Sequence, residues 1–109
     1  MMNNKAIALL SDVDKSNYNE KNFYQISPLM FQKINEKIPG KNGNQRTLLL
    51  YLIFQQQNGD FYPAETTILQ ACSMVHSRYS DARKALHDLG LITYIQNVSI
   101  TINYKKIME

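Results

Sequence analysis

Apolar residues recur at helical spacing over most of the chain and change to alternate spacing near its end. The first regular run lies between Ser27-Pro28 and Pro39-Gly40. Serine followed by proline is typical of a helix N-cap and first turn, whereas proline followed by glycine ends a helix. The pattern therefore predicts a helix that begins at Pro28 and runs through Lys37, preceded by a short strand at Phe23–Ile26. The recurring apolar positions are Leu29, Met30, Ile34 and Ile38.

A second helix is predicted over Thr47–Gln57, after the turn residues Lys41–Asn44. Apolar residues occupy all sides of this segment, which is typical of a helix at the centre of a fold. They are Leu48, Leu49, Tyr51, Leu52 and Phe54. Asn58–Asp60 ends the helix, and Phe61–Pro63 is expected to be extended because proline disfavours helix at the residue before it. A third helix is predicted over Ala64–Cys72, with Ile68, Leu69 and Cys72 as its buried face.

A further amphipathic run is predicted to form a helix over His76–Leu89, and Gly90 is a strong signal for its end. Its inward positions are Tyr79, Ala82, Leu86 and Leu89. The period then changes to two in Ile92–Ile95 and Val98–Tyr104, and Gln96-Asn97 between them predicts a tight hairpin turn. The chain is therefore expected to have an α+β fold, with three to four helices and a C-terminal β-hairpin.

Composition divides the chain into two parts. Residues 1–22 are rich in Asn, Lys and acids, and we interpret them as a flexible segment in which the apolar patch Ala6–Leu10 is a candidate dimerisation arm. Residues 23–109 are expected to form one domain. The apolar run Leu48–Phe54 is far shorter than the roughly 20 residues of a membrane span, and no secretory signal is recognised at the start. Together with the single Cys72, this predicts a cytoplasmic protein without a membrane segment or disulfide.

The residues that carry chemistry argue against an enzyme. Cys72 and His76 are four apart, but a predicted turn separates them and His87 is the only other imidazole in the sequence, so neither a metal site nor a nucleophile pair is expected. Glycines are too few for a phosphate-binding loop. No cofactor, metal or catalytic residue is therefore predicted. The 12 Lys and Arg residues against 9 acids give a charge of +3, which favours an acidic partner only weakly.

The order of these elements resembles the winged helix-turn-helix domains of plasmid and phage replication or transfer proteins. The resemblance covers residues 23–104, and its most specific part is Ala85-Leu86 followed by Leu89-Gly90-Leu91-Ile92. It implies that residues 64–72 form the first motif helix, that residues 76–89 form the recognition helix, and that the hairpin is a wing. One departure is the turn, which has Ser73 in place of the usual glycine; Ser77 is expected to cap the recognition helix.

The resemblance makes the outward face of the predicted recognition helix a candidate DNA reader. Arginine pairs bidentately with guanine, serine and histidine donate or accept, and lysine suits phosphate. The candidate residues are His76, Ser77, Arg78 and Lys84. Asp81 on the same face opposes DNA unless it meets cytosine or holds a neighbouring cation. The alternative is that these mixed charges form only a solvated helix face.

The wing and one loop offer further candidate contacts. In the last strand, one alternating face carries Ser99, Thr101, Asn103 and Lys105, and the other carries Ile100, Ile102 and Tyr104. The wing candidates are Gln96, Asn97, Ser99, Thr101, Lys105 and Lys106, which suit A·T-rich minor grooves and phosphate. Lys41 and Arg46 beside a Gly/Asn-rich loop are candidate contacts to the DNA backbone. For the turn and the loop, ordinary polar surface is the alternative.

The resemblance implies a sequence-specific accessory protein of a mobile element that binds double-stranded DNA, with A·T-rich DNA as the expected form. Because the sequence ends soon after the wing, we expect it to bind an origin of transfer and assist a relaxase in plasmid conjugation, as TcpK-like relaxosome proteins do. The alternatives are a transcriptional regulator, a replication-origin binder that works with a replication protein, and a protein-docking module that does not bind DNA. A homodimer is expected because so small a domain reads few base pairs.

Overall fold

The computed structural model describes residues 26–109, in which five helices and one two-stranded antiparallel sheet are present. The helices are α3 (Pro28–Lys37), α4 (Gly43–Gln57), α5 (Glu65–Cys72), α6 (His76–Asp88) and α7 (Tyr104–Met108), and the strands are β1 (Ile92–Ile95) and β2 (Ser99–Ile102). The fold is therefore α+β, as predicted, and the order of its helices and strands is compatible with a winged helix. The predicted strand at Phe23–Ile26 and the Ala6–Leu10 arm lie almost wholly outside the described residues; Ile26, the one described residue among them, is not in a strand.

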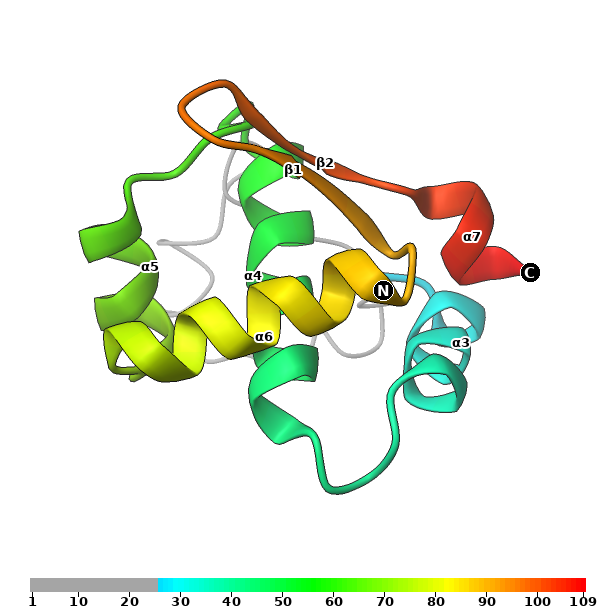
Figure 1. Cartoon of the computed structure of the whole chain (residues 1–109). Helices are drawn as coiled ribbons and strands as arrows, with labels where there is room; N and C mark the ends of the chain where they lie inside the picture. Colours follow the sequence, from blue (N-terminus) through cyan, green and yellow to red (C-terminus); the bar gives the residue numbers. More distant parts are fainter. Residues whose placement is uncertain (1–25) are drawn as a thin grey trace, which may run out of the picture.

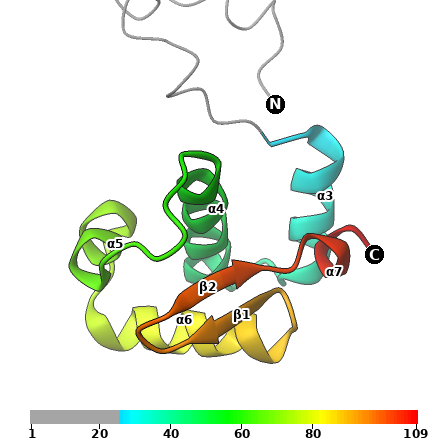
Figure 2. The ribbon, with the colours of Figure 1, turned by 90° about the horizontal axis from the view of Figure 1, so that it is seen from above.

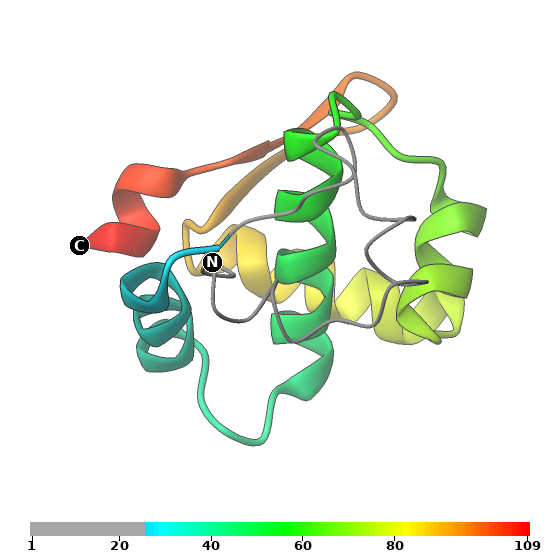
Figure 3. The same cartoon turned by 180° about the vertical axis from the view of Figure 1, so that it is seen from behind.

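Helix α4 is central, as the apolar pattern predicted. Its side chains Leu48, Leu49 and Ile53 have no exposed surface, and it packs against α5, α6 and β2. Figures 1 and 3 show α6 crossing one side of α4, with α5 at one end of α6 and the start of β1 at the other; from there the hairpin runs back across α4. The core of the domain is thus built around α4.

Helix α3 begins as its sequence predicted. The Ser27 hydroxyl oxygen accepts a hydrogen bond from the Met30 amide at 3.0 Å, and Pro28 lies in the first turn. The helix ends before the extended residue Ile38, which is fully buried. Helix α4, by contrast, begins at Gly43 rather than at Thr47. The chain reversal is already complete at Asn42, whose amide donates to the Pro39 carbonyl oxygen at 3.0 Å.

Helices α4, α5 and α6 end in the same hydrogen-bonded motif. In α5 the Met74 amide donates to the Leu69 carbonyl at 2.9 Å, and Ser73 takes a left-handed conformation with φ 53°. Gly59 and Gly90 take the equivalent position after α4 and α6, with φ 86° and 77°. The left-handed residue lets the backbone satisfy the last carbonyls of each helix and turn sharply. Serine therefore fills the position at which the resemblance favours glycine.

The hairpin is shorter than predicted. Ile92 pairs with Ile102 and Ile95 with Ser99, so the turn contains three residues rather than two, with Asn97 in a left-handed conformation at φ 59°. Ile100 and Ile102 face the core, as the alternation predicted. One backbone bond, from the Ile100 amide to the Phe61 carbonyl at 3.2 Å, joins the segment 61–63 to β2.

The end of the chain contradicts the prediction of a strand through Tyr104. The chain leaves the sheet at Asn103, whose amide donates to Leu91 and whose side-chain amide donates to the Gly90 carbonyl at 2.8 Å. Helix α7 follows and packs on α3, with Ile107 fully buried (Figure 2). The hairpin is thus followed by a helix, and Tyr104 is 41% exposed instead of facing inward. Leu89, also predicted to be inward, is equally exposed because α6 has ended before it.

Candidate nucleic-acid interface

The candidate interface is the outward face of α6. Burial of Tyr79, Ala82 and Leu86 against the core fixes the rotation of this helix. Because residues three and four apart share a helix face, the opposite side carries the polar positions. Those positions are Ser77, Arg78, Asp81 and Lys84, and all four are exposed, as the amphipathic pattern predicted.

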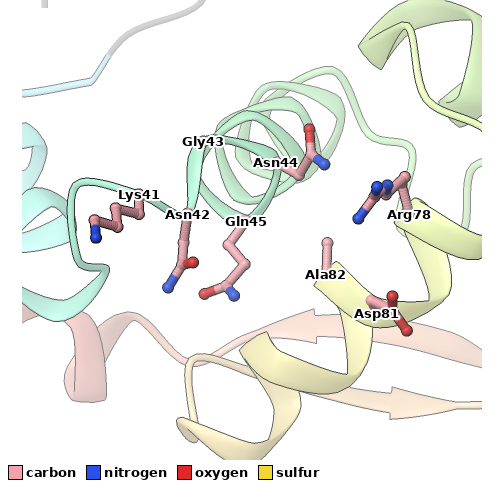
Figure 4. A pocket seen from close by; sticks show the side chains of 8 residues that line it. All are labelled: Lys41, Asn42, Gly43, Asn44, Gln45, Arg78, Asp81 and Ala82. Carbon is pink, nitrogen blue, oxygen red and sulfur yellow. The ribbon is translucent and has the colours of Figure 1, made fainter.

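One hollow lies between α6 and the start of α4. It is lined from α6 by Arg78, Asp81 and Ala82, and from the other side by Lys41 and the residues that follow it through Gln45. Figure 4 shows Arg78 pointing from α6 towards Asn44, with Lys41 at the opposite end of the hollow. The structure thus places two candidate cations, 37 positions apart in the sequence, at opposite ends of one hollow. The start of α4 has no side-chain cap, so its first amides add partial positive charge at this edge.

A second hollow lies between α6 and β1. Its lining residues are Ser80, Asp81, Arg83, Lys84, His87 and Tyr94. Asp81 lines both hollows, so the two adjoin along α6. Together they contain four cationic side chains, Lys41, Arg78, Arg83 and Lys84, and one carboxylate.

The positive charge of this face is not neutralised by ion pairs. Among residues 26–109, the ion pairs are Lys33–Glu36, His76–Glu65 and Lys106–Glu109. None of them includes Lys41, Arg78, Arg83 or Lys84. Asp81 therefore opposes a larger positive charge, and the face as a whole attracts an anion.

His76 has a structural role that the sequence did not indicate. Its Nδ1 atom lies 3.0 Å from a Glu65 carboxylate oxygen on α5, and its Nε2 atom lies 3.4 Å from the Ser80 hydroxyl. The imidazole therefore joins α5 to α6 at the turn, although it is 68% exposed. The expected cap by Ser77 is wrong: Val75 is the N-cap residue, without a side-chain hydrogen bond, and α6 already begins at His76.

Arg46, a predicted backbone contact, points into the protein instead. Its guanidinium donates to the carbonyl oxygens of Pro39 and Gly40, both at 2.8 Å, and to that of Ile38 at 3.3 Å. These three carbonyls belong to the residues that directly follow α3. Arg46 therefore ties the α3–α4 loop together and does not line the hollow that Lys41 lines.

The predicted wing residues separate into two groups. Gln96, Asn97 and Thr101 are exposed on the hairpin, and Ser99 is half-buried. Lys105 and Lys106 do not lie on the hairpin, because the strand ends at Ile102 and both belong to α7. Lys106 pairs with Glu109 at 3.5 Å, and its aliphatic stem lies against Gly90. None of these six residues lines either hollow.

Arg83 and two tyrosines form a contact that was not predicted. The guanidinium carbon of Arg83 lies 4.0 Å from the centre of the Tyr94 ring and 5.2 Å from that of Tyr79. Burial, followed by a hydrogen bond with Tyr62, raises the pKa of Tyr94. The spacing of Tyr79 and Arg83, four apart on one helix, was the available signal. The contact to Tyr94 depends on the placement of β1 against α6.

Other chemistry is sparse in the part of the chain that the structure describes. No cluster of three His, Cys, Asp or Glu side chains suited to a metal ion occurs there. Burial raises the pKa of the Cys72 thiol, so this cysteine is a weaker nucleophile at neutral pH than an exposed one. None of the helices there has both the length and the apolar character to cross a bilayer.

Comparison of the chain with protein-family models, with curated proteins and with solved structures found no match in any of the three.

Proposed function

We propose that the chain is a winged helix-turn-helix protein that binds double-stranded DNA through the outward face of α6. One observation carries the proposal: four unneutralised cations, Lys41, Arg78, Arg83 and Lys84, gather in two adjoining hollows along this helix. A DNA duplex presents a dense array of phosphates, and its major groove accepts an α-helix. The face of α6 supplies both the charge and the shape for that partner.

The surroundings of each side chain assign it a role in this complex. Arg78 is exposed near the start of α6, where a recognition helix contacts base edges, and it suits guanine. Lys41 lines the first hollow and Lys84 the second, and both suit contacts to phosphate. Asp81 lines both hollows. Its carboxylate repels phosphate and accepts a hydrogen bond from the amino group of a cytosine. His76 orients the start of α6 through Glu65.

The biological role rests on the resemblance given above. We propose an accessory protein of a mobile element that binds an origin of transfer and assists a relaxase; promoter or replication-origin binding are the alternatives. Selection of bound fragments from the element's own DNA tests this choice. Enrichment of a repeat beside a relaxase gene supports a role in transfer. Enrichment of a promoter supports transcriptional regulation instead, and enrichment of a replication origin supports a role in replication.

DNA binding itself is tested by variants in the first hollow. We expect Lys41→Ala to weaken binding to every duplex and to reduce the slope of log affinity against log salt by about one, since one phosphate contact is lost. Arg78→Ala should cost about 1–3 kcal/mol on the selected site and relax its sequence preference. Fluorescence anisotropy over a salt series measures both effects.

The matched control is Lys105→Ala, which removes one exposed lysine from α7, outside both hollows. Its salt slope should stay at that of the original protein. Equal losses in Lys41→Ala and Lys105→Ala would mean that only net charge attracts DNA and that the α6 face has no special role.

A protein-docking function is a second candidate, favoured by apolar side chains near the hairpin turn. Phe61, Ile95 and Val98 are 58%, 51% and 64% exposed. Exposed large apolar side chains grouped together are typical of interaction surfaces. If the protein binds neither the selected fragments nor random duplex at low salt, the docking function replaces DNA binding.

A further inference from the structure

A chain of side-chain contacts connects α6 to the turn of the hairpin. Arg83 of α6 stacks on the ring of Tyr94 in β1 at 4.0 Å. The side chain of Tyr62 interacts with that of Tyr94 and, after burial, contributes to the raised pKa of Tyr94. The Tyr62 hydroxyl oxygen in turn accepts a hydrogen bond from the backbone amide of Asn97, in the hairpin turn, at 2.7 Å. Four residues from four separate segments are thus linked in series.

Each contact limits one way in which the hairpin can move. A two-stranded hairpin alone is marginally stable in water, and its turn is the part farthest from the core. The Tyr62–Asn97 bond ties this turn to the chain segment that follows α4, and it does so at a residue with the left-handed φ of 59°. The flat stack of Arg83 on Tyr94 sets the separation between α6 and β1.

We propose that Arg83 and Tyr62 are positioning residues that hold the hairpin turn and the α6 face in one fixed relation, so that both meet DNA together. This inference rests on the proposed DNA-binding function. Preorganisation of two contact surfaces reduces the ordering cost of binding. The hairpin turn thereby contributes to affinity although its residues line neither hollow.

The surroundings of Arg83 distinguish positioning from simple charge. Arg83 is only partly exposed, and its guanidinium lies over the rings of Tyr79 and Tyr94. Lysine keeps the charge but lacks the flat guanidinium that makes these contacts. Arg83→Lys should therefore lower affinity for a selected duplex about tenfold with an unchanged salt slope. Wild-type affinity in Arg83→Lys would show that Arg83 acts through charge alone and would overturn its positioning role.

Tyr62→Phe tests the other end of the chain of contacts. Loss of the hydroxyl should speed amide hydrogen exchange at Asn97 about fivefold, which corresponds to the net stabilisation of about 1 kcal/mol given by one hydrogen bond. The same variant should weaken DNA binding about fivefold. Tyr104→Phe is the matched control, because its hydroxyl makes only a long 3.4 Å bond to Gln56, away from the turn. It should change neither quantity.

A double-mutant cycle decides whether Tyr62 acts through the turn. Gln96→Ala removes an exposed turn side chain, and Tyr62→Phe added to it should cost less than twofold, because the contact that Tyr62 positions is already lost. Additive losses would overturn the inference. Normal DNA affinity in Tyr62→Phe, together with faster amide exchange at Asn97, would also overturn the inference. The proposed DNA-binding function would stand in that case. Absence of DNA binding by the unaltered protein would overturn the function and the inference built on it, whatever the exchange rates.

Discussion

Lys41 and Arg46 flank one loop, yet their side chains have opposite surroundings. Lys41 is exposed at the edge of a hollow, whereas three carbonyl oxygens hold the Arg46 guanidinium. Both are basic residues beside a Gly/Asn-rich stretch, so composition assigns them the same role. Only the geometry of the guanidinium, which has five donors in a plane, distinguishes them.

This difference predicts opposite effects of substitution. Arg46→Ala should lower the free energy of unfolding by about 1–2 kcal/mol, since it removes the guanidinium hydrogen bonds to the carbonyl oxygens of Ile38, Pro39 and Gly40. Urea denaturation measures this loss. Lys41→Ala is the paired variant and should unfold as the original protein does while binding DNA less tightly. A stable Arg46→Ala protein with weak DNA binding would reverse the assignment of the two residues.

At the scale of elements, the ends of α4, α5 and α6 control the path of the chain. Gly59, Ser73 and Gly90 each take positive φ within two residues of the end of a helix. The glycines were readable from the sequence as stop signals. Ser73 was not, because serine has a side chain that disfavours this conformation and no local pattern marks it. The turn before α6 therefore has the expected shape from an unexpected residue.

Gly90 links α6 to the hairpin, and alanine there should be costly. With φ at 77°, Gly90→Ala should destabilise the protein by about 1–2 kcal/mol. The added methyl group meets only the Lys106 stem at 3.6 Å, so backbone conformation and not a clash is the cause. Gly40→Ala is the control: its φ is not positive and nothing lies within 4 Å of an added methyl group. Equal thermal stability of the two variants would contradict this explanation.

At the scale of the whole molecule, the packing of the other elements around α4 partly buries several tyrosine side chains. Burial is the main cause of a raised pKa at Tyr79, against the opposing effect of Arg83, and burial also raises the pKa of Tyr94 and Tyr104. The unfolded chain ionises its tyrosines near pH 10, at about their ordinary pKa. Between that pH and the higher native pKa values, the native state holds more protons than the unfolded state.

Stability should therefore fall as the pH rises above about 10, and this contribution should be fully present below that pH. Urea unfolding at a series of alkaline pH values measures the decline. Tyr79→Phe removes one of the titrating groups and should make the decline shallower. A decline of the same steepness in Tyr79→Phe would show that Tyr79 does not contribute to it.

Local patterns determined most of the elements. Ser27-Pro28 and Pro39 bracket α3, the apolar residues around α4 marked it as central, and the period of α6 identified which side chains face solvent. These predictions succeeded because capping, proline geometry and burial periodicity act over a few neighbouring residues. The boundary errors occur where distant residues intervene. Helix α7 is the main example, since it packs against α3, which is distant in the sequence, and its Ile107 is fully buried in the core.

The candidate site required the tertiary structure. The sequence determined that Arg78 and Lys84 lie on the outward face of one helix, because helical spacing alone decides that. It did not determine that Lys41 lies across a hollow from Arg78, that Arg46 turns inward, or that Arg83 meets Tyr94. These facts depend on how α4, α6 and β1 pack, and each joins residues with no local relation. Periodicity determines which side of an element is polar, whereas packing decides which polar sides meet.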